Sequence, residues 1–413
     1  MIPERVHKLD AVFGISRELP ETYVERDNID DVLINSLARD KHIVIFGSSK
    51  QGKTCLRKHC LEEKDYIVAS CQNNWTLTQL HSAILKAAGY STQEARTRTA
   101  DGRLKLDLVF TGNVGVPGVV QAGVRAGASG GHGVSQTEER RRLEIDPQDP
   151  NDIIAALREI DFKQFLVLED FHYIPVEPQE AFSFVLKAFY EISDLVFIIV
   201  AVWREENRLI VFNGDLTGRV VAIDADAWSP NQLGEVIRHG EVLLNIEFAE
   251  QFKTQLIENS FESVYIVQET IADGIDPENL IRDVVNEQSG RYKSFLTNFA
   301  MGYQDTELQM FRWLLYPVLV ADIDELQNGL RYSDIRKAIQ ASHPRGADLN
   351  LGNLTQALQS ATQLQSKKNI KPFVLDYDRT NLVLSIVDKG FLIWLQNQNK
   401  KELLELLDLP SDG

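Results

Sequence analysis

Short apolar runs alternate with amphipathic stretches through the first half of the chain, and this alternation predicts an α/β fold. Apolar runs of about four to eight residues are typical of strands that are buried on both faces. Five segments have this pattern: 42–46, 66–71, 165–168, 195–202 and 220–223. Between them lie stretches long enough for helices, such as 76–88 and 179–192. The order predicts a parallel sheet that is covered by helices on both faces.

From residue 229 onward, helical periodicity replaces the strand pattern. Four segments fit a small helical lid: 230–240, 249–258, 264–272 and 278–288. Three further helices and two strands follow, at 308–320, 332–341, 351–365, 371–377 and 382–387. This order is typical of a winged helix-turn-helix. A last apolar helix is expected over 391–407.

Residues 90–150 interrupt the alternation and are interpreted as an insertion. Glycines cluster there, at positions 112, 115, 118, 123, 127, 130, 131 and 133. Such a density of glycine favours a flexible surface loop. The alternation of Leu104, Leu106, Leu108 and Phe110 favours a projecting hairpin instead. We therefore expect a core over 1–228 with this insertion, a lid over 229–300, and a winged helix with a C-terminal helix over 301–413.

Composition limits the class of protein. With 413 residues and 44% apolar content, the chain is long enough for two or three domains with real cores. Its longest apolar run, 195–203, is far shorter than the roughly 18 residues of a membrane-spanning helix, and the first ten residues lack a signal-peptide pattern. The three cysteines have no CxxC spacing, which disfavours a zinc site or a disulfide framework. We expect a cytoplasmic protein with no membrane partner.

A phosphate-binding motif directly follows the first apolar run. Residues 47–54 match G-x-x-x-x-G-K-[ST]. Its glycines let backbone N–H groups curl around a phosphate at the start of a helix, where an anion is favoured. Lys53 would reach the β- and γ-phosphates, and Thr54 would hold Mg²⁺. The ATP site is expected to include Gly47, Ser48, Ser49, Lys50, Gln51, Gly52, Lys53, Thr54 and Cys55.

Two carboxylates follow the third apolar run. Glu169 and Asp170 come directly after residues 165–168. The first acid would lie in the outer shell of the Mg²⁺ held by Thr54, and the second would orient or deprotonate the attacking water. Most ATPases of this layout carry Asp and then Glu, so the reversed order favours slow turnover. His172 follows closely but is interpreted as a core histidine.

With the phosphate loop and the acidic pair, the chain resembles the AAA+ and STAND group of P-loop ATPases. In layout it is similar to origin-recognition and transposition-accessory ATPases, over residues 15–400. The resemblance implies an α/β P-loop NTPase core, a helical lid, a C-terminal winged helix and a slow or assembly-dependent ATPase. It also implies that the adenine contacts map onto Tyr23, Val24 and Arg26, although a solvated turn is an alternative.

The resemblance assigns roles to three arginines. Arg204 follows the fourth strand, where STAND proteins place an arginine that senses the γ-phosphate, with Asn207 and Arg208 as fallbacks. Arg219 precedes the fifth strand, where the family presents an arginine finger to the nucleotide of an adjacent subunit. A structural salt bridge is the alternative for Arg219. In the lid, Arg291 corresponds to a second sensor or to an ordinary surface arginine. A finger in trans implies a homo-oligomer.

The net charge of −17 disfavours wholesale coating of nucleic acid, but the C-terminal module differs from the rest. Between residues 327 and 379 there are eight Lys and Arg against four acids. Helix 351–365 would turn Thr355, Gln356, Gln359, Ser360 and Gln363 outward, with Lys367, Lys368 and Lys371 near the wing. Glutamine can read adenine and lysine can anchor phosphate, so the module can contact DNA. Docking to a protein, or autoinhibition, is the other interpretation.

Three hypotheses follow. The first is an ATP-dependent molecular switch that couples nucleotide state to oligomerisation and to engagement of a protein effector, in a setting of bacterial regulation or defence suggested by the STAND resemblance. The second is an AAA+ ATPase that acts on duplex DNA, of the initiator, loader or transposition-accessory type. The third is a nucleotide-binding scaffold with negligible turnover. All three take ATP with Mg²⁺ as the ligand.

Overall fold

A computed structural model describes residues 7–14, 18–98, 104–110, 141–226, 228–272, 277–303, 308–346 and 349–411. Five parallel strands form its central sheet in the order β2-β6-β7-β1-β8. They are β1 (His42–Phe46), β2 (Tyr66–Ser70), β6 (Phe165–Glu169), β7 (Phe197–Val200) and β8 (Val220–Asp224). The predicted parallel sheet is confirmed. Because β1 lies between β7 and β8, the carboxyl ends of these three strands surround the loop that follows β1.

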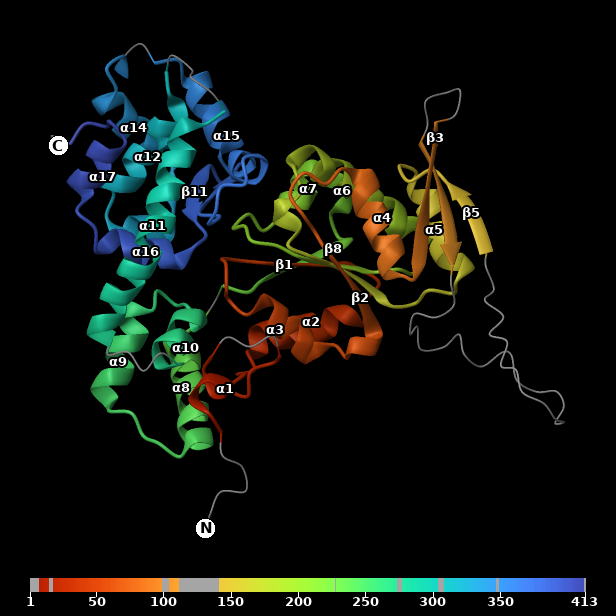
Figure 1. The fold of residues 1–413 in the computed structure, drawn as a ribbon, viewed down its shortest axis with the longest axis horizontal. Coiled ribbons are helices and arrows are strands. Elements are labelled where there is room, and N and C mark those ends of the chain that lie inside the picture. The colour runs from red at the N-terminus through yellow and green to blue at the C-terminus, as the bar shows by residue number, and fades with distance from the viewer. Residues whose placement is uncertain are drawn as a thin grey trace.

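Helices cover both faces of the sheet, as its apolar strands require. Alternate residues of β1 point to opposite faces. Ile43 and Ile45 pack with α2 (Asp27–Leu37) and α3 (Lys53–Cys60). Val44 and Phe46 pack on the other face with α4 (Leu77–Ala87), α5 (Pro150–Glu159) and α6 (Val176–Ile192). Figure 1 shows the two helical layers on either side of the sheet.

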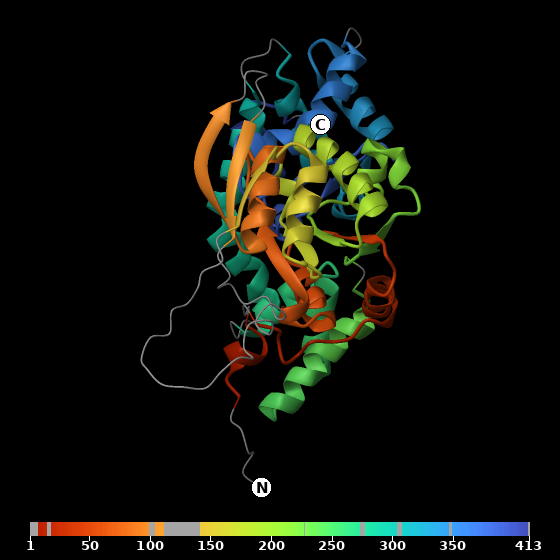
Figure 2. The same ribbon diagram turned by 90° about the vertical axis from the view of Figure 1, so that its right-hand side faces the viewer.

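The insertion forms a small sheet of its own. β3 (Tyr90–Arg98), β4 (Leu104–Phe110) and β5 (Arg141–Ile145) pair antiparallel in that order. The hairpin expected around Leu104–Phe110 is therefore confirmed, and this sheet faces the viewer in Figure 2. The Tyr90 hydroxyl donates to the Ala156 carbonyl of α5 at 2.6 Å and fixes the sheet to the core. The glycine cluster at 112–133 lies outside the described residues.

The lid contains α8 (Pro230–Leu244), α9 (Glu250–Asn259) and α10 (Val264–Ala272), and α1 (Leu9–Val12) packs against it. The next helix, α11 (Pro277–Met301), is much longer than the expected 278–288. Its second half carries fully buried residues that join the core of the C-terminal domain: Tyr292, Phe295, Leu296 and Phe299. The helix continues because this apolar stripe has a partner to pack against, which the sequence of the helix does not reveal.

The C-terminal domain has the elements of a winged helix. Its helices are α12 (Met310–Val320), α13 (Ile323–Asn328), α14 (Tyr332–Ser342) and α15 (Leu351–Lys367). β9 (Leu330–Arg331), β10 (Leu375–Asp378) and β11 (Val383–Ile386) form an antiparallel sheet in the order β10-β11-β9. Figure 1 shows this domain above the lid, with α14 on the side away from the sheet of the core.

The expected last helix over 391–407 is wrong, because two helices occupy this stretch. α16 (Lys389–Gln396) ends before Asn397, and α17 (Lys400–Leu406) begins after Asn399. The Asn399 side chain accepts from the Lys401 backbone N–H at 3.1 Å and caps the second helix. An Asn that bonds to the backbone in this way competes with a continuous helix. Among the described residues, no helix is long and apolar enough to cross a bilayer.

Candidate nucleotide-binding site

The phosphate loop connects β1 to α3. Gly47 has φ of 137° and Gly52 has φ of 80°, both in the region that side chains rarely adopt. At Gly47 a Cβ atom would also lie 3.1 Å from the Asp226 carboxylate. Gly52 precedes Lys53, the first residue of α3, so the start of that helix faces the inside of the loop. The two glycines of the motif therefore occupy positions where the backbone demands them.

Lys53 lies buried beneath the loop. Its Nζ donates to the carbonyl of Gly47 at 3.1 Å and to the carbonyl of Ser48. Burial lowers the pKa of Lys53 to about 8, against the opposing effect of Asp226 and Glu169. The lysine is thus held at the centre of the loop by neutral carbonyl groups, and a phosphate there would supply the negative charge that it lacks.

The two carboxylates lie at the end of β6. Glu169 accepts from Arg57 Nε at 2.9 Å and lies 3.5 Å from the Thr54 hydroxyl. Asp170 is in a left-handed conformation with φ of 57°, and among the described residues no hydrogen bond holds its carboxylate. Burial raises the pKa of both acids. The structure therefore brings Thr54, Lys53 and the acidic pair together, with Glu169 fixed and Asp170 available.

A pocket of about 300 Å³ adjoins the loop. Its walls come from the core and from the lid: Gly14, Pro20, Ser49, Lys50, Gln51, Gly52, Lys53, Thr54, Cys55, Glu169, Asp170, His172, Val200, Ala201, Val202, Val264, Tyr265 and Gln268. The Lys50 Nζ lies 3.6 Å from the centre of the Tyr265 ring of α10, so the lid contacts the loop directly. The pocket joins the loop, the acids and the lid in one space.

Of the three residues expected to contact adenine, Val24 and Arg26 lie beside the lid, and Tyr23 lies against α2 and α3. Arg26 is buried, donates to the Ala225 carbonyl at 2.9 Å and lies 4.3 Å from the Trp228 ring. Val24 is buried in the apolar cluster that includes Trp228. Tyr23 stacks on His59 and donates to Asp30 at 2.5 Å. The N-terminal residues that line the pocket are instead Gly14 and Pro20.

Arg204 lies close to the phosphate loop, and its side chain contacts the carboxylate of Asp226. Its guanidinium pairs with Asp226, and its backbone N–H donates to Asp376 at 2.9 Å. The fallback Arg208 is buried and pairs with Asp376 at 2.6 Å and with Glu205 at 3.1 Å. Asn207 precedes α7 (Arg208–Phe212).

Arg219 lies at the other end of the sheet. Its carbonyl accepts from the N–H of His42 at the start of β1, whereas the phosphate loop follows the end of that strand. The guanidinium pairs with Glu191 at 2.9 Å and donates to the Asp215 carbonyl at 2.9 Å. Arg219 therefore does not reach the nucleotide site of its own chain, and it forms a salt bridge, its alternative role.

Arg291 lies on α11. Its Nη2 is 3.8 Å from the carboxylate of Asp388, and its side chain is 44% exposed. Asp388 caps α16 and directly follows Val387, which contacts the phosphate loop. Arg291 is thus linked to the phosphate loop indirectly, through Asp388 and Val387 of the winged helix.

Several residues at the site have no signal in the sequence. Asp226 accepts from the Ser48 backbone N–H at 2.7 Å and from its hydroxyl at 2.8 Å. The Val387 carbonyl of the winged helix accepts from the Ser49 N–H at 2.8 Å. Both contacts join segments more than a hundred residues apart, and neither residue belongs to a local motif. Only the fold brings them to the loop.

The winged helix also docks on the core through α15. Gln363 donates to Glu177 of α6 at 3.1 and 3.2 Å, and Lys367 lies 3.5 Å from the same carboxylate. The Ser366 hydroxyl donates to the His172 carbonyl at 3.4 Å. Val202, Phe373 and Val387 form a small apolar cluster between the two domains. Part of the face expected to read DNA is therefore in contact with the core.

Comparisons with known proteins place the fold. No family model matches the chain, and no curated protein matches it. Among solved structures, the Walker-type ATPase PABY2304 of Pyrococcus abyssi is similar, with a TM-score of 0.53, 12% identity, and coverage of 93% of this chain and 99% of that one. The Aeropyrum pernix ORC1 protein, solved with DNA, is similar over 96% of each chain with 11% identity and a TM-score of 0.44.

The Pyrococcus likeness shows that the chain has the fold of a Walker-type, P-loop ATPase. The fold class expected from the sequence is confirmed. The resemblance to P-loop ATPases is confirmed at the level of fold.

Proposed function

We propose that this protein is an ATP-binding and ATP-hydrolysing molecular switch in which the nucleotide controls the position of the winged helix. The observation that carries the proposal is the contact between the Ser49 N–H of the phosphate loop and the Val387 carbonyl of the winged helix. Backbone N–H groups of this loop are the donors that bind phosphate. A nucleotide and the winged helix would therefore compete for one donor.

The residues at the site fit Mg·ATP. The loop has glycines at positive φ, Lys53 is buried among carbonyl groups, and Thr54 lies beside Glu169. Thr54 would bind Mg²⁺ directly and Glu169 would act through its water shell. When bound, the metal ion would neutralise charge on the phosphates.

Hydrolysis would depend on the second acid. Asp170 lies beside the pocket with no hydrogen bond to its carboxylate among the described residues, so it is the group that can orient a water. Glu169 is instead tied to Arg57. Arg219 would complete the site from a neighbouring subunit, which makes turnover slow in the monomer and dependent on assembly.

An ATPase assay combined with mass measurement tests the proposal. The switch predicts that hydrolysis rises with protein concentration and that the mass in ATP exceeds the mass in ADP. Duplex DNA should leave the rate unchanged if the effector is a protein. Turnover that is independent of concentration, with equal mass in both nucleotides, would contradict the switch.

A second candidate is an ATPase that acts on duplex DNA. It is favoured by exposed cations on the winged helix: Arg331 in β9, and Arg336 and Lys337 in α14. Phosphate contacts of this kind release counterions, so binding would weaken steeply with salt. The double variant Arg336→Ala, Lys337→Ala should then reduce the slope of log affinity against log salt concentration by about two. If both results are found, duplex DNA and not a protein is the partner of the winged helix. The variant Lys64→Ala, on the surface of the core, is the control.

A further inference from the structure

A chain of polar contacts runs from the phosphate loop into the winged helix. Its first member is Asp226, which follows β8 and is 4% exposed. The carboxylate accepts from the N–H and the hydroxyl of Ser48, and it also pairs with the guanidinium of Arg204. Burial alone would raise the pKa of Asp226, but Arg204 and Lys389 hold it below the usual value. Asp226 therefore stays charged and fixes one residue of the loop.

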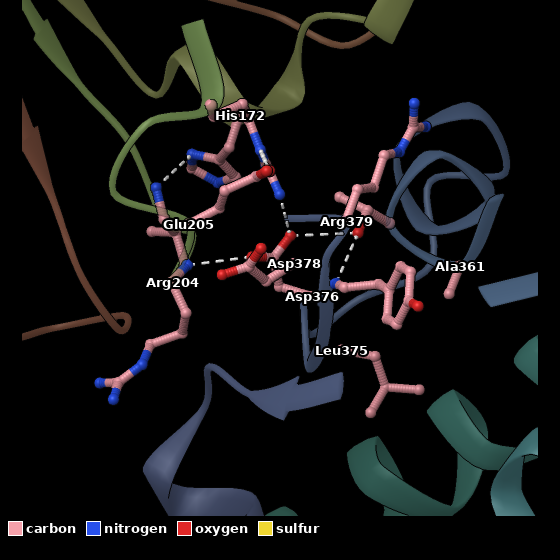
Figure 3. Close-up of polar contacts among 12 residues, drawn as sticks. His172, Arg204, Glu205, Ala361, Leu375, Asp376, Asp378 and Arg379 are labelled. Atoms are coloured by element: carbon pink, nitrogen blue, oxygen red, sulfur yellow. Dashed lines mark hydrogen bonds and ion pairs between the residues drawn. The ribbon is translucent and has the colours of Figure 1, made fainter. Parts of the chain in front are cut away.

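The second half of the chain crosses the domain boundary. The backbone N–H of Arg204 donates to Oδ2 of Asp376 at 2.9 Å, and Arg208 donates to Oδ1 at 2.6 Å. Asp376 belongs to β10 of the winged helix and is fully buried. Figure 3 shows Arg204 and Asp376 approaching each other from the two domains. Arg204 thus contacts Asp226, which holds the phosphate loop, through its side chain, and contacts the winged helix through its backbone N–H.

Asp376 needs these partners because its charge is buried. Within its own domain the carboxylate accepts from the Thr362 hydroxyl at 3.1 Å, and its cationic partner, Arg208, comes from the core. A buried carboxylate that loses its cationic partner is strongly destabilised. Separation of the domains therefore has to expose Asp376 to water, and Arg208 would keep only Glu205.

The contact at Asp376 and the contact at Val387 belong to one rigid piece. The Val387 N–H donates to the Val374 carbonyl at 2.8 Å, and Val374 lies two residues before Asp376 in the same segment. The strands β10 and β11 pair between these contacts. A movement that takes the Val387 carbonyl away from Ser49 therefore takes Asp376 away from Arg204 and Arg208.

We propose that Asp376 is a positioning residue whose contacts with Arg204 and Arg208 hold the winged helix, and with it the Val387 carbonyl, against the phosphate loop. In this arrangement, the Ser49 N–H cannot bind a phosphate while Asp376 keeps its contacts with Arg204 and Arg208. Asp226 keeps Ser48 in place, so the loop remains shaped for phosphate whichever partner it has. The inference rests on the proposed function, because it assigns the residues through which that switch acts.

The test compares two neighbouring carboxylates in the full chain. Asp376→Asn removes the charge that pairs with Arg208. Asp378→Asn is the matched control, because Asp378 lies in the same strand, is 5% exposed, and accepts from Thr380 and Asn381 within the wing. The probe is ATPγS with Mg²⁺, measured by calorimetry. Because opening frees the Ser49 N–H, Asp376→Asn should bind the nucleotide about fivefold or more tightly than wild type, in the range of ordinary allosteric coupling.

A second measurement uses wild type alone and does not depend on how the variants fold. Amide hydrogen exchange at Arg204 should accelerate when Mg·ATPγS saturates the protein, because the Asp376 acceptor leaves. Exchange at Ser49 should stay slow, because phosphate replaces the Val387 carbonyl. A general loosening would accelerate both.

The outcomes separate the inference from the proposed function. If wild type gives no binding heat with Mg·ATPγS, the proposed function fails. If wild type binds but Arg204 stays equally protected, the coupling chain is overturned while nucleotide binding stands. Equal affinities of wild type, Asp376→Asn and Asp378→Asn would overturn it as well.

Discussion

At the scale of single residues, Lys53 has an unusual electrostatic position. Burial lowers its pKa to about 8, and the groups that it contacts are carbonyl oxygens. ATP would place phosphate charge beside it and raise that pKa again. At pH near 8 a fraction of the lysines would be neutral before binding and protonated after it. We therefore predict that ATP binding at pH 8 takes up protons, and that uptake is smaller at pH 6.5.

Calorimetry in buffers of different ionisation enthalpy measures this uptake. Lys53→Arg is the control, because a guanidinium stays charged over this range and should bind without uptake. Binding heats of wild type that are independent of the buffer at pH 8 would show that the lysine is fully charged before the nucleotide arrives.

The same lysine predicts a pH dependence of stability. In the unfolded chain its pKa is 10.5, and in the folded protein it is about 8. Between these values the unfolded state binds more protons, so the contribution of Lys53 to stability rises as pH increases from about 8 to about 10.5. Lys53→Met should therefore stabilise the protein against urea more at pH 7.5 than at pH 10. A stabilisation that is equal at both values would contradict the burial effect.

The two acids predict different defects. Asp170→Asn should keep ATP binding and lower hydrolysis by about 10²- to 10⁴-fold, the usual contribution of a general base. Glu169→Gln should weaken the dependence of binding on Mg²⁺, since Glu169 lies beside Thr54. Single-turnover hydrolysis and binding titrations with and without Mg²⁺ separate the two effects. If Asp170→Asn hydrolyses normally, Glu169 is the group that activates water.

The sequence identifies residues that belong to a contiguous motif and misses residues that the fold supplies. Lys53 and the acidic pair are each marked by a local pattern beside an apolar run. Asp226 and Asp376 carry no such mark, because their partners come from distant segments. The sequence predicts Arg204 near the nucleotide, but not its contact with Asp226, because Asp226 follows the distant strand β8.

At the scale of elements, apolar patterns predicted which segments become strands and helices better than where they end. The five core strands and α10 lie where the patterns placed them. α11 is longer than expected, and the last helix is divided at Asn399. Tertiary packing extends α11, and the side-chain cap of Asn399 divides the last helix. Hydrophobic periodicity predicts neither effect.

Arg219 allows a prediction about assembly. As a finger in trans, Arg219→Ala should bind ATP normally and hydrolyse it poorly. Mixing it with Asp170→Asn should restore part of the activity, because some interfaces would then combine an intact Arg219 with an intact Asp170. Glu191→Gln is the control, since it breaks the ion pair of Arg219 but keeps the arginine. No recovery in the mixture would leave Arg219 as a partner of Glu191 alone.

At the scale of the whole molecule, the winged helix contacts the phosphate loop directly, through the Val387 carbonyl and the Ser49 N–H. The sequence predicted both modules but not their contact, because docking depends on surfaces such as Glu177 with α15. In the protein, part of the expected DNA-reading face is used within the chain. Any partner of that face must therefore compete with the core, and the nucleotide provides the energy for that competition only if it binds the open form more tightly.

The most direct test of the account is a calorimetric titration of Mg·ATP into the full chain, beside Lys53→Ala. The account predicts saturable binding by wild type and a loss of binding in the variant, because the lysine is the buried cation of the phosphate loop. An absence of binding heat in wild type, or equal affinity in the two proteins, would contradict it.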